Sequence, residues 1–238
     1  MKTILVVFSC MLFFAVSLAQ NAPPTFETKK YSMIAQGKKC ETINDYLRNC
    51  VGYPYECLKN KDEGTEVVKF EVTPNGELMN FEVVNSVSPV IDKHVIQMLR
   101  QTSGMWTPGL KNGKPAKMEK EISILFKYDE FEEFAIHKDF KKKAKGLLER
   151  GNKLLLEKNK PEKALKYFNR GIRYLPNEDC LLISRGMCRY KLGDIKGAHE
   201  DWTRLKAVGK IDLGNEKLVE RFRNFDGYEL FAQILEVN

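Results

Sequence analysis

The chain has 238 residues, of which 43% are apolar and 30% charged, and this composition excludes a disordered chain. A chain of this length suits one large or two small globular domains. The net charge of +7 at pH 7 is compatible with binding to nucleic acid or anionic lipid. This charge is local, because residues 138–173 alone hold thirteen Lys or Arg against four acids. Their placement on the outer positions of expected helices favours a solvated face.

The first segment of the chain is apolar. Lys2 precedes an uncharged run, residues 3–19, that ends in Ser17-Leu18-Ala19 with small residues at the −3 and −1 positions. This pattern predicts a signal peptide over residues 1–19 that is cut between Ala19 and Gln20. An uncleaved membrane anchor is the alternative, because the run is at the short limit of a membrane span.

Five cysteines follow the expected cleavage site, an odd number that is too small for a disulfide scaffold. Cys180 and Cys188 lie on one expected helix, too far apart to bond directly, and we expect them to be small core residues. The sequence neither predicts nor excludes a single disulfide among Cys40, Cys50 and Cys57.

The first domain is expected over residues 41–128, after a short linker at 20–40. Helical pieces near 43–51 and 55–59 come first. Residues 64–72 and 77–87 then alternate apolar and polar side chains around Pro74-Asn75-Gly76, which predicts a β-hairpin. A helix from Ser88-Pro89 to about Gln101 and a third alternating run ending at Tyr128 complete the pattern. The fold class is α+β, a three-stranded antiparallel sheet with helices.

The connection between this helix and the third strand holds Trp106 and two turn signals. We expect the Trp106 ring to cover the core between helix and sheet. Pro108-Gly109 is expected to reverse the chain, and Asn112-Gly113 to form the tight loop before the last strand. Trp106, Pro108 and Gly109 are therefore interpreted as structural residues.

Taken in order, these features resemble the C-terminal domain of TonB, a periplasmic protein that contacts outer-membrane transporters. The residues that carry the resemblance are Tyr53-Pro54, Gly64–Val72, Asn75-Gly76, Ile91-Asp92, Trp106-x-Pro108-Gly109, Asn112-Gly113-Lys114 and Phe126. The resemblance implies a bacterial envelope protein, located in the periplasm or anchored in the inner membrane and facing the periplasm.

The resemblance also implies a binding site. In the TonB-like fold the third strand lies at a sheet edge, whose unpaired backbone groups invite an added strand. In this family a Tyr-Pro pair at the position of Tyr53-Pro54 helps to frame the partner groove. The candidate partner-binding residues of the first domain are Tyr53, Pro54, Glu121, Ser123, Leu125 and Lys127.

Residues 144–209 repeat with a period near 34 residues. Two pairs of similar residues are 34 apart and a third is 35 apart: Ala164 and Ala198, Phe168 and Trp202, Gly151 and Gly186. Paired helices with this period and small residues at their crossings resemble the tetratricopeptide repeat. The sequence thus predicts an all-α solenoid of two repeats, in which Ala164, Ala198 and Trp202 have structural roles.

Two repeats leave outer faces uncovered, so caps are expected. The available segments are the connector at 129–143 and residues 215–222 and 228–235 within a C-terminal capping region at 210–238. The repeat groove supplies the remaining candidate partner contacts, Asn152, Leu155, Met187 and Tyr190.

No catalytic or metal-ligating pattern is found. The three histidines are scattered, without cysteines or carboxylates at ligand spacing, and neither a nucleophile elbow nor a phosphate loop occurs. We expect no catalytic residue, metal or cofactor. An enzyme with a site that the sequence does not reveal is a remaining alternative.

Both modules bind polypeptides in their families. The sequence therefore predicts a non-catalytic periplasmic adaptor whose partners are envelope proteins or peptides, an outer-membrane transporter among them, and not nucleic acid. A TonB-type energy transducer is the alternative. Transducers need a membrane helix and a long, Pro-rich spacer, whereas residues 20–40 reach ~70 Å at most and hold two prolines. The adaptor is favoured.

Overall fold

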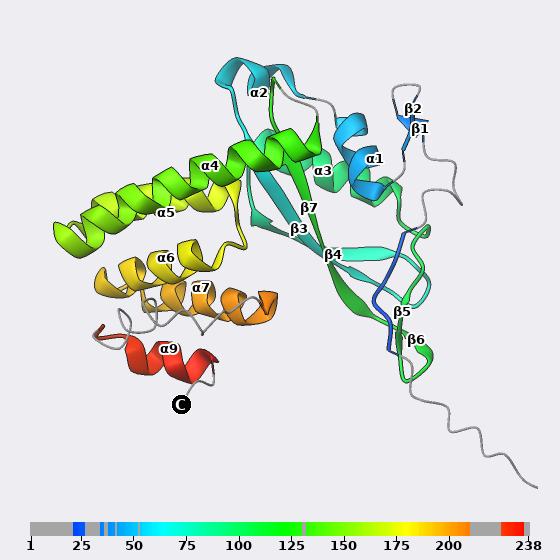
Figure 1. Cartoon of the computed structure of the whole chain (residues 1–238). Coiled ribbons are helices and arrows are strands. Elements are labelled where there is room, and N and C mark those ends of the chain that lie inside the picture. The colour runs from blue at the N-terminus through cyan, green and yellow to red at the C-terminus, as the bar shows by residue number, and fades with distance from the viewer. Residues whose placement is uncertain are drawn as a thin grey trace, which may run out of the picture.

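The computed structural model describes residues 21–26, 34–35, 38–40, 42–51, 53–129, 132–209 and 225–235. These form a sheet half, up to residue 129, and a helical half after it (Figure 1). The expected cleavage site at Ala19 and Gln20 lies outside the described residues. In the ranges described, no helix is both long and apolar enough to cross a membrane.

The sheet half contains a three-stranded antiparallel sheet in the order β4-β3-β7, as the alternating runs predicted. The strands are β3 (Gly64–Val72), β4 (Leu78–Asn85) and β7 (Met118–Phe126). β7 pairs with β3 in one unbroken register, from Gly64 opposite Phe126 to Val72 opposite Met118. The register between β3 and β4 shifts twice. β7 and β4 are the two edges.

Three helices accompany the core face of this sheet: α1 (Ile43–Val51), α2 (Tyr55–Asn60) and α3 (Pro89–Gln101). α3 begins at Pro89 because the Ser88 side chain accepts the Ile91 N–H at 3.4 Å, which caps the helix. Its apolar face packs on the inward side chains of the sheet in one cluster. The cluster includes Ile91, Val95 and Leu99 with Val68, Phe70, Ile122, Ile124 and Phe126.

Trp106 covers this core as expected. Its ring is 4% exposed and meets Phe70 edge to face at 5.2 Å between centroids. The expected reversal at Pro108-Gly109 is wrong, because the chain turns earlier, at residues 102–104, where Gly104 has a φ of 83°. Gly109 instead begins a strand in a crowded place: a Cβ there would stand 2.4 Å from Met118 Sδ and 2.9 Å from the Ala22 carbonyl.

Two small hairpins complete the sheet half. β5 (Gly109–Lys111) and β6 (Lys114–Ala116) flank Asn112-Gly113, and both turn residues have positive φ, as a tight two-residue turn requires. β1 (Ile34–Ala35) pairs with β2 (Lys38–Lys39). Part of the expected linker is packed rather than free, because Ala22 and Thr25 exchange backbone hydrogen bonds of 2.8–3.1 Å with Leu110 and Thr107.

The helical half consists of antiparallel helix pairs (Figure 1). Its helices are α4 (Glu133–Asn152) with a π-helical end (Lys153–Glu157), α5 (Pro161–Tyr174), α6 (Asp179–Lys191), α7 (Ile195–Val208) and α9 (Tyr228–Leu235). Residues 133–143, expected in the connector, belong to α4. Ile136 and Phe140 are buried there because they share the helix face of Ala144 and Leu147.

The same glycine-to-ring contact occurs in both helix pairs. A Cβ on Gly151 would stand 2.4 Å from the Phe168 ring, and one on Gly186 would stand 2.2 Å from Trp202 Nε1. Phe168 and Trp202 are both fully buried, as are Ala164 and Ala198. The helices of each pair can approach closely because the glycines have no side chain.

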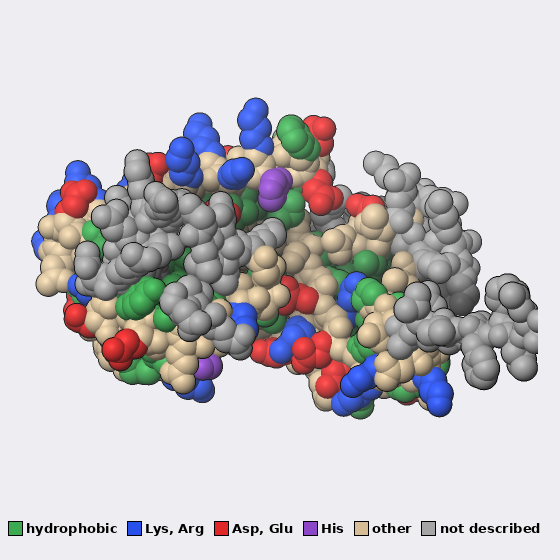
Figure 2. Space-filling model, turned by 60° about the horizontal axis from the view of Figure 1, so that its bottom comes forward, with side chains coloured by type: hydrophobic (Ala, Val, Ile, Leu, Met, Phe, Trp, Pro, Cys, Tyr) green, Lys and Arg blue, Asp and Glu red, His purple; other side chains and the backbone are tan. Residues whose placement is uncertain are grey.

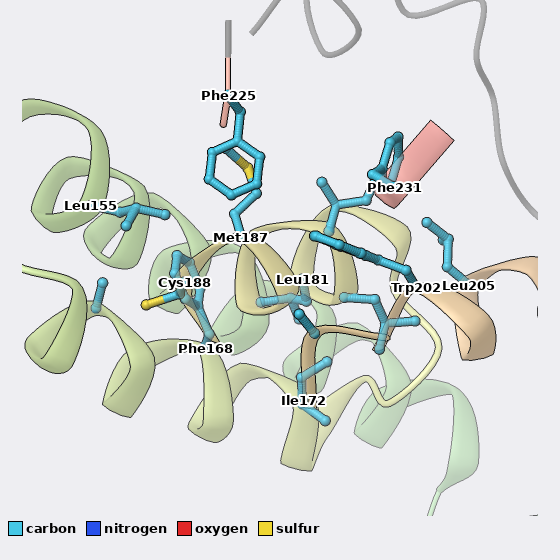
Figure 3. Packing of buried hydrophobic residues seen from close by; sticks show 14 of the residues in the cluster. Leu155, Phe168, Ile172, Leu181, Met187, Cys188, Trp202, Leu205, Phe225 and Phe231 are labelled. Carbon is cyan, nitrogen blue, oxygen red and sulfur yellow. The ribbon is translucent and has the colours of Figure 1, made fainter. Parts of the chain in front are cut away.

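The C-terminal residues cover the open side of the last pair. Phe231 of α9 meets Trp202 edge to face at 5.4 Å, and Phe225 meets Tyr190 at 5.4 Å. Figure 3 shows Phe225 above Met187 and Phe231 beside Trp202. The other expected capping segment, residues 215–222, lies outside the described residues.

The cysteines whose side chains the structure describes are all free thiols: Cys40, Cys57, Cys180 and Cys188. Cys40 and Cys57 are buried, and the Cys57 thiol lies 3.2 Å from the Ser88 hydroxyl. Cys188 is a core residue as expected, while Cys180 is half-buried.

The helical half packs on the sheet face that α3 leaves open. The Thr65 hydroxyl donates to the Tyr174 carbonyl at 2.6 Å, and the Asn85 amide donates to the Arg173 carbonyl at 3.3 Å. The guanidinium of Arg204 in α7 donates two hydrogen bonds of 3.0 Å to the Glu121 carboxylate of β7. These polar contacts orient the two halves.

Candidate functional site

The outer edge of β7 is the candidate site. In an antiparallel strand, the N–H and C=O of one residue point to the same side, and the side alternates along the strand. The Asn44 side-chain amide of α1 donates to the Ser123 carbonyl at 3.0 Å. The backbone N–H and C=O of Ser123 therefore point away from β3, and those of Glu119, Glu121 and Leu125 point the same way.

Part of this edge is open to a new strand. The outward N–H and C=O groups of Glu119 and Glu121 have no hydrogen-bond partner among the described residues. The Ser123 carbonyl is different, because Asn44 holds it. A strand that pairs along the whole edge would therefore have to displace the Asn44 amide.

The opposite edge is less suited to pairing. The register of β4 against β3 shifts between Val67 and Val68 and again between Lys69 and Glu71. Asn80 in β4 has a left-handed φ of 54°. Bulges of this kind twist an edge and protect it from added strands. Of the two edges, β7 is the regular one.

A cleft of about 450 Å³ lies beside the β7 edge, between the sheet and the helical half. We call it the edge cleft. It is lined by Ser123 and Leu125 of β7, His137 and Lys141 of α4, and Leu175 and Pro176 of the loop after α5. A strand added to β7 would direct every second side chain to the face of Ser123 and Leu125, which is the face of this cleft.

The expected site residues in β7 and directly after it divide into two groups. Ser123 and Leu125 line the edge cleft. Glu121 and Lys127 have partners in the helical half: Glu121 pairs with Arg204 at 3.0 Å, and Lys127 lies 3.4 Å from Asp139. The two charged side chains thus attach β7 to the helices, and their backbone groups are what an added strand would meet.

Tyr53 and Pro54 lie beyond the end of β7 that carries Phe126. The Tyr53 ring meets the Phe126 ring edge to face at 6.2 Å, and its hydroxyl donates to the Asp62 carbonyl. Burial raises the pKa of Tyr53 above its usual value. Pro54 precedes the first residue of α2. The pair closes the end of the sheet, and the next residue, Tyr55, is 81% exposed.

The four candidates of the helical half are largely covered. Leu155 is 2% exposed and Met187 is 7% exposed. Tyr190 stacks on Trp202 and meets Phe225. The Asn152 side chain accepts a hydrogen bond from the Ser184 hydroxyl at 3.1 Å. Phe225 lies over Met187 (Figure 3) and meets the Tyr190 ring, so the chain's own C-terminal residues occupy the surface that was expected to receive a partner.

A second cleft, of about 580 Å³, lies between β4 and helices α6 and α7. Asp201 in its wall is 2% exposed and pairs with Arg185 at 2.5 Å and Arg189 at 3.2 Å. This buried ion cluster holds α6 and α7 together. Among the described residues, no group of three or more His, Cys, Asp or Glu side chains is placed to hold a metal.

Sequence reasoning missed Asn44 and the helical wall of the edge cleft. Asn44 is 79 residues from Ser123 along the chain, and no local pattern marks it. Leu175 and Pro176 directly follow α5 in the chain. Their position beside β7 follows from how the helical half docks on the sheet.

Residues 51–128 match a protein family. The family model is described as Gram-negative bacterial TonB protein C-terminal, and the match runs from the end of α1 through β7. The expected resemblance to the TonB C-terminal domain is confirmed over this range, about a third of the chain. No curated protein and no solved structure matches the chain.

The family match indicates a TonB-like envelope protein, and TonB C-terminal domains in general interact with outer-membrane proteins. The matched range contains the β7 edge with Ser123 and Leu125. The expected tetratricopeptide repeats have no supporting family match and stay a prediction.

Proposed function

We propose that this protein is a non-catalytic envelope adaptor that binds an extended peptide by strand addition to β7. The peptide would pair first with the open backbone groups of Glu119 and Glu121. It would belong to a protein of the cell envelope, with an outer-membrane transporter as one candidate. Main-chain hydrogen bonds would supply affinity, and side-chain pockets would supply selectivity.

The observation that carries the proposal is the unbroken edge of β7. Its nine residues pair with β3 without a bulge, so the outward backbone groups recur regularly at every second residue and can meet a second partner. The edge cleft adds a place for a side chain of the peptide. Leu125, Leu175 and Pro176 in its wall favour an apolar side chain.

For the helical half we propose two tetratricopeptide repeats, α4 with α5 and α6 with α7. Support comes from the equivalent contacts of Gly151 with Phe168 and of Gly186 with Trp202. In this proposal α9 closes the array, and the repeats chiefly form one wall of the edge cleft. A partner at Met187 and Tyr190 would have to displace Phe225 and α9.

The test uses proline at an outward position. Peptides of ~12 residues that bind the parent protein would be selected by display and measured against Ser123→Pro and Ser123→Ala. The Ser123 N–H points outward, so proline removes a donor from the edge without breaking a bond to β3. We expect Ser123→Pro to weaken binding by about tenfold, at about 1.4 kcal/mol for each tenfold change, while Ser123→Ala binds as the parent does.

Ile124→Pro is the folding control, because the Ile124 N–H points to β3 and its loss should destabilise the sheet. Melting of all three variants establishes which are folded. A folded Ser123→Pro protein that binds the peptides as tightly as Ser123→Ala would exclude strand addition that reaches Ser123 and the edge cleft.

A further inference from the structure

The outer face of α4 and α5 carries a dense positive charge. Of the thirteen Lys and Arg residues between 138 and 173, twelve are exposed. They are Lys138, Lys141, Lys142, Lys145, Arg150, Lys153, Lys158, Lys160, Lys163, Lys166, Arg170 and Arg173. We call this surface the basic face. The exposed acids of α4, α5 and the segment between them are Glu133, Glu149, Glu157 and Glu162.

These charges are not neutralised within the described part of the chain. None of the twelve forms an ion pair with another described residue. The thirteenth, Lys143, turns inward and pairs with Glu63 and Asp139. Protein surfaces usually intersperse the two signs, so a two-helix layer with this excess has a strong positive field.

An exposed aromatic residue stands at one end of the basic face. Phe134 is 77% exposed, and its spacing to Lys138, Lys141 and Lys145 places all four on one side of α4. Figure 2 shows Lys and Arg side chains along the upper edge of the molecule, with a hydrophobic side chain near one end of the row. An amphipathic surface of this type suits a membrane interface.

We propose that the basic face docks on an anionic phospholipid bilayer, with Phe134 entering the headgroup region. Nine of the twelve residues are lysines, which act as mobile point charges rather than as the fixed forks that arginines offer. They project from α4, α5 and the segment that joins these helices, so they can meet many headgroups at once. Each basic residue near such a surface strengthens binding about fivefold, which is about 1 kcal/mol.

Nucleic acid is the competing partner for a basic surface. Single-stranded binding relies on several aromatic rings that stack on bases along a groove. Phe134 is the one exposed aromatic residue within α4 and α5. The TonB-like envelope character of residues 51–128 also favours a lipid surface.

The test is sedimentation with vesicles of phosphatidylcholine alone or with ~30% phosphatidylglycerol, using the expected mature chain from Gln20. One variant changes Lys138, Lys142, Lys145 and Lys166 to Gln on the basic face. The matched control changes four exposed lysines elsewhere, Lys59, Lys93, Lys111 and Lys114, to Gln. Both variants lose the same net charge, and neither touches the edge cleft.

We expect the parent and the control to bind the anionic vesicles at least about tenfold more tightly than the basic-face variant. Binding to phosphatidylcholine alone should be weak for all three. Phe134→Ser should weaken anionic binding several-fold and leave its salt dependence unchanged.

Three results would overturn the proposal. One is a parent protein with no preference for anionic vesicles. Another is an equal loss of binding in the two lysine variants, which would show an effect of net charge alone. The third is competition by duplex DNA. If DNA releases the protein from the vesicles at a phosphate concentration below that of the lipid phosphate, the basic face would be reassigned to nucleic-acid binding.

Discussion

Gly186 lies directly against the indole of Trp202, and a Cβ at position 186 would stand 2.2 Å from the ring nitrogen. Gly151 has the same relation to Phe168. In both pairs the ring is fully buried and belongs to the helix that follows the glycine. The recurrence of one close crossing, 35 residues apart, is the best structural support for a repeat in the helical half.

Adding one methyl group at either crossing should therefore destabilise the protein. We expect Gly186→Ala and Gly151→Ala each to lower the free energy of unfolding by about 1–3 kcal/mol, because the rings have no space to move away. Urea unfolding measures the loss. Gly146→Ala is the control: it lies on α4 with nothing within 4 Å of its Cβ and should gain about 0.5–1 kcal/mol. Equal effects at Gly146 and Gly186 would argue against a close crossing.

Stability should fall as pH rises because of Glu66. Its carboxyl group is fully buried on the core face of β3, where it accepts the Val87 N–H at 2.9 Å through Oε2. Oε1 has no partner among the described residues. Burial raises the pKa of Glu66 to about 8; the Val87 hydrogen bond opposes this shift, and Asp92 adds to it.

The direction of this pH dependence follows from the number of protons that the folded and unfolded states bind. Between pH 4.5, the ordinary pKa, and pH 8 the folded state holds a proton that the unfolded chain has lost. The stability present at low pH is therefore lost progressively as pH rises through this window, by at most about 5 kcal/mol. Urea unfolding at about pH 5 and about pH 8.5 measures the change.

Glu66→Gln separates this effect from other titrations. The amide keeps an acceptor for the Val87 N–H and does not ionise. The free energy of unfolding of this variant should therefore vary less with pH than that of the parent. At the higher pH we expect the variant to be more stable than the parent. A parent and a variant with parallel pH profiles would show that Glu66 does not stay protonated in the fold.

Trp106 should matter for stability. Its ring is held by Phe70, and its Nε1 donates to the Thr102 hydroxyl at 2.9 Å. Trp106→Ala should cost ~3–5 kcal/mol, whereas Thr102→Val, which removes the hydrogen-bond partner, should cost about 1 kcal/mol. Thermal melting compares them. A Trp106→Ala protein that melts as the parent does but no longer binds selected peptides would make Trp106 a contact residue.

Removing the Asn44 amide should open the β7 edge further. Asn44→Ala frees the Ser123 carbonyl, so peptides that bind the parent by strand addition should bind the variant several-fold more tightly. Thr42→Ala, on the same segment, is the control. It removes the hydroxyl that accepts the Asp45 N–H at the start of α1, and it does not remove the Asn44 amide. Titration calorimetry measures both. Weaker binding by Asn44→Ala would show that α1 supports the peptide site instead of occupying it.

Local patterns in the sequence determined much of the fold. The alternation of β3, β4 and β7, the Ser88 cap of α3 and the tight turn at Asn112-Gly113 all depend on residues a few positions apart. For the same reason the period of Gly, Ala and aromatic residues predicted the helix pairs. The reversal at Pro108-Gly109 was wrong because Gly109 serves a close approach of distant segments, Ala22 and Met118, rather than a turn.

What the tertiary structure alone decided is how distant segments meet. Asn44 reaches Ser123, Arg204 grips Glu121, and Phe225 covers Tyr190, and these contacts join residues 79, 83 and 35 positions apart. A sequence pattern reports which side chains share one face of a helix or strand. It does not report which other element covers that face, because that choice depends on the packing of the whole chain, and here it decides which part of the β7 edge stays open.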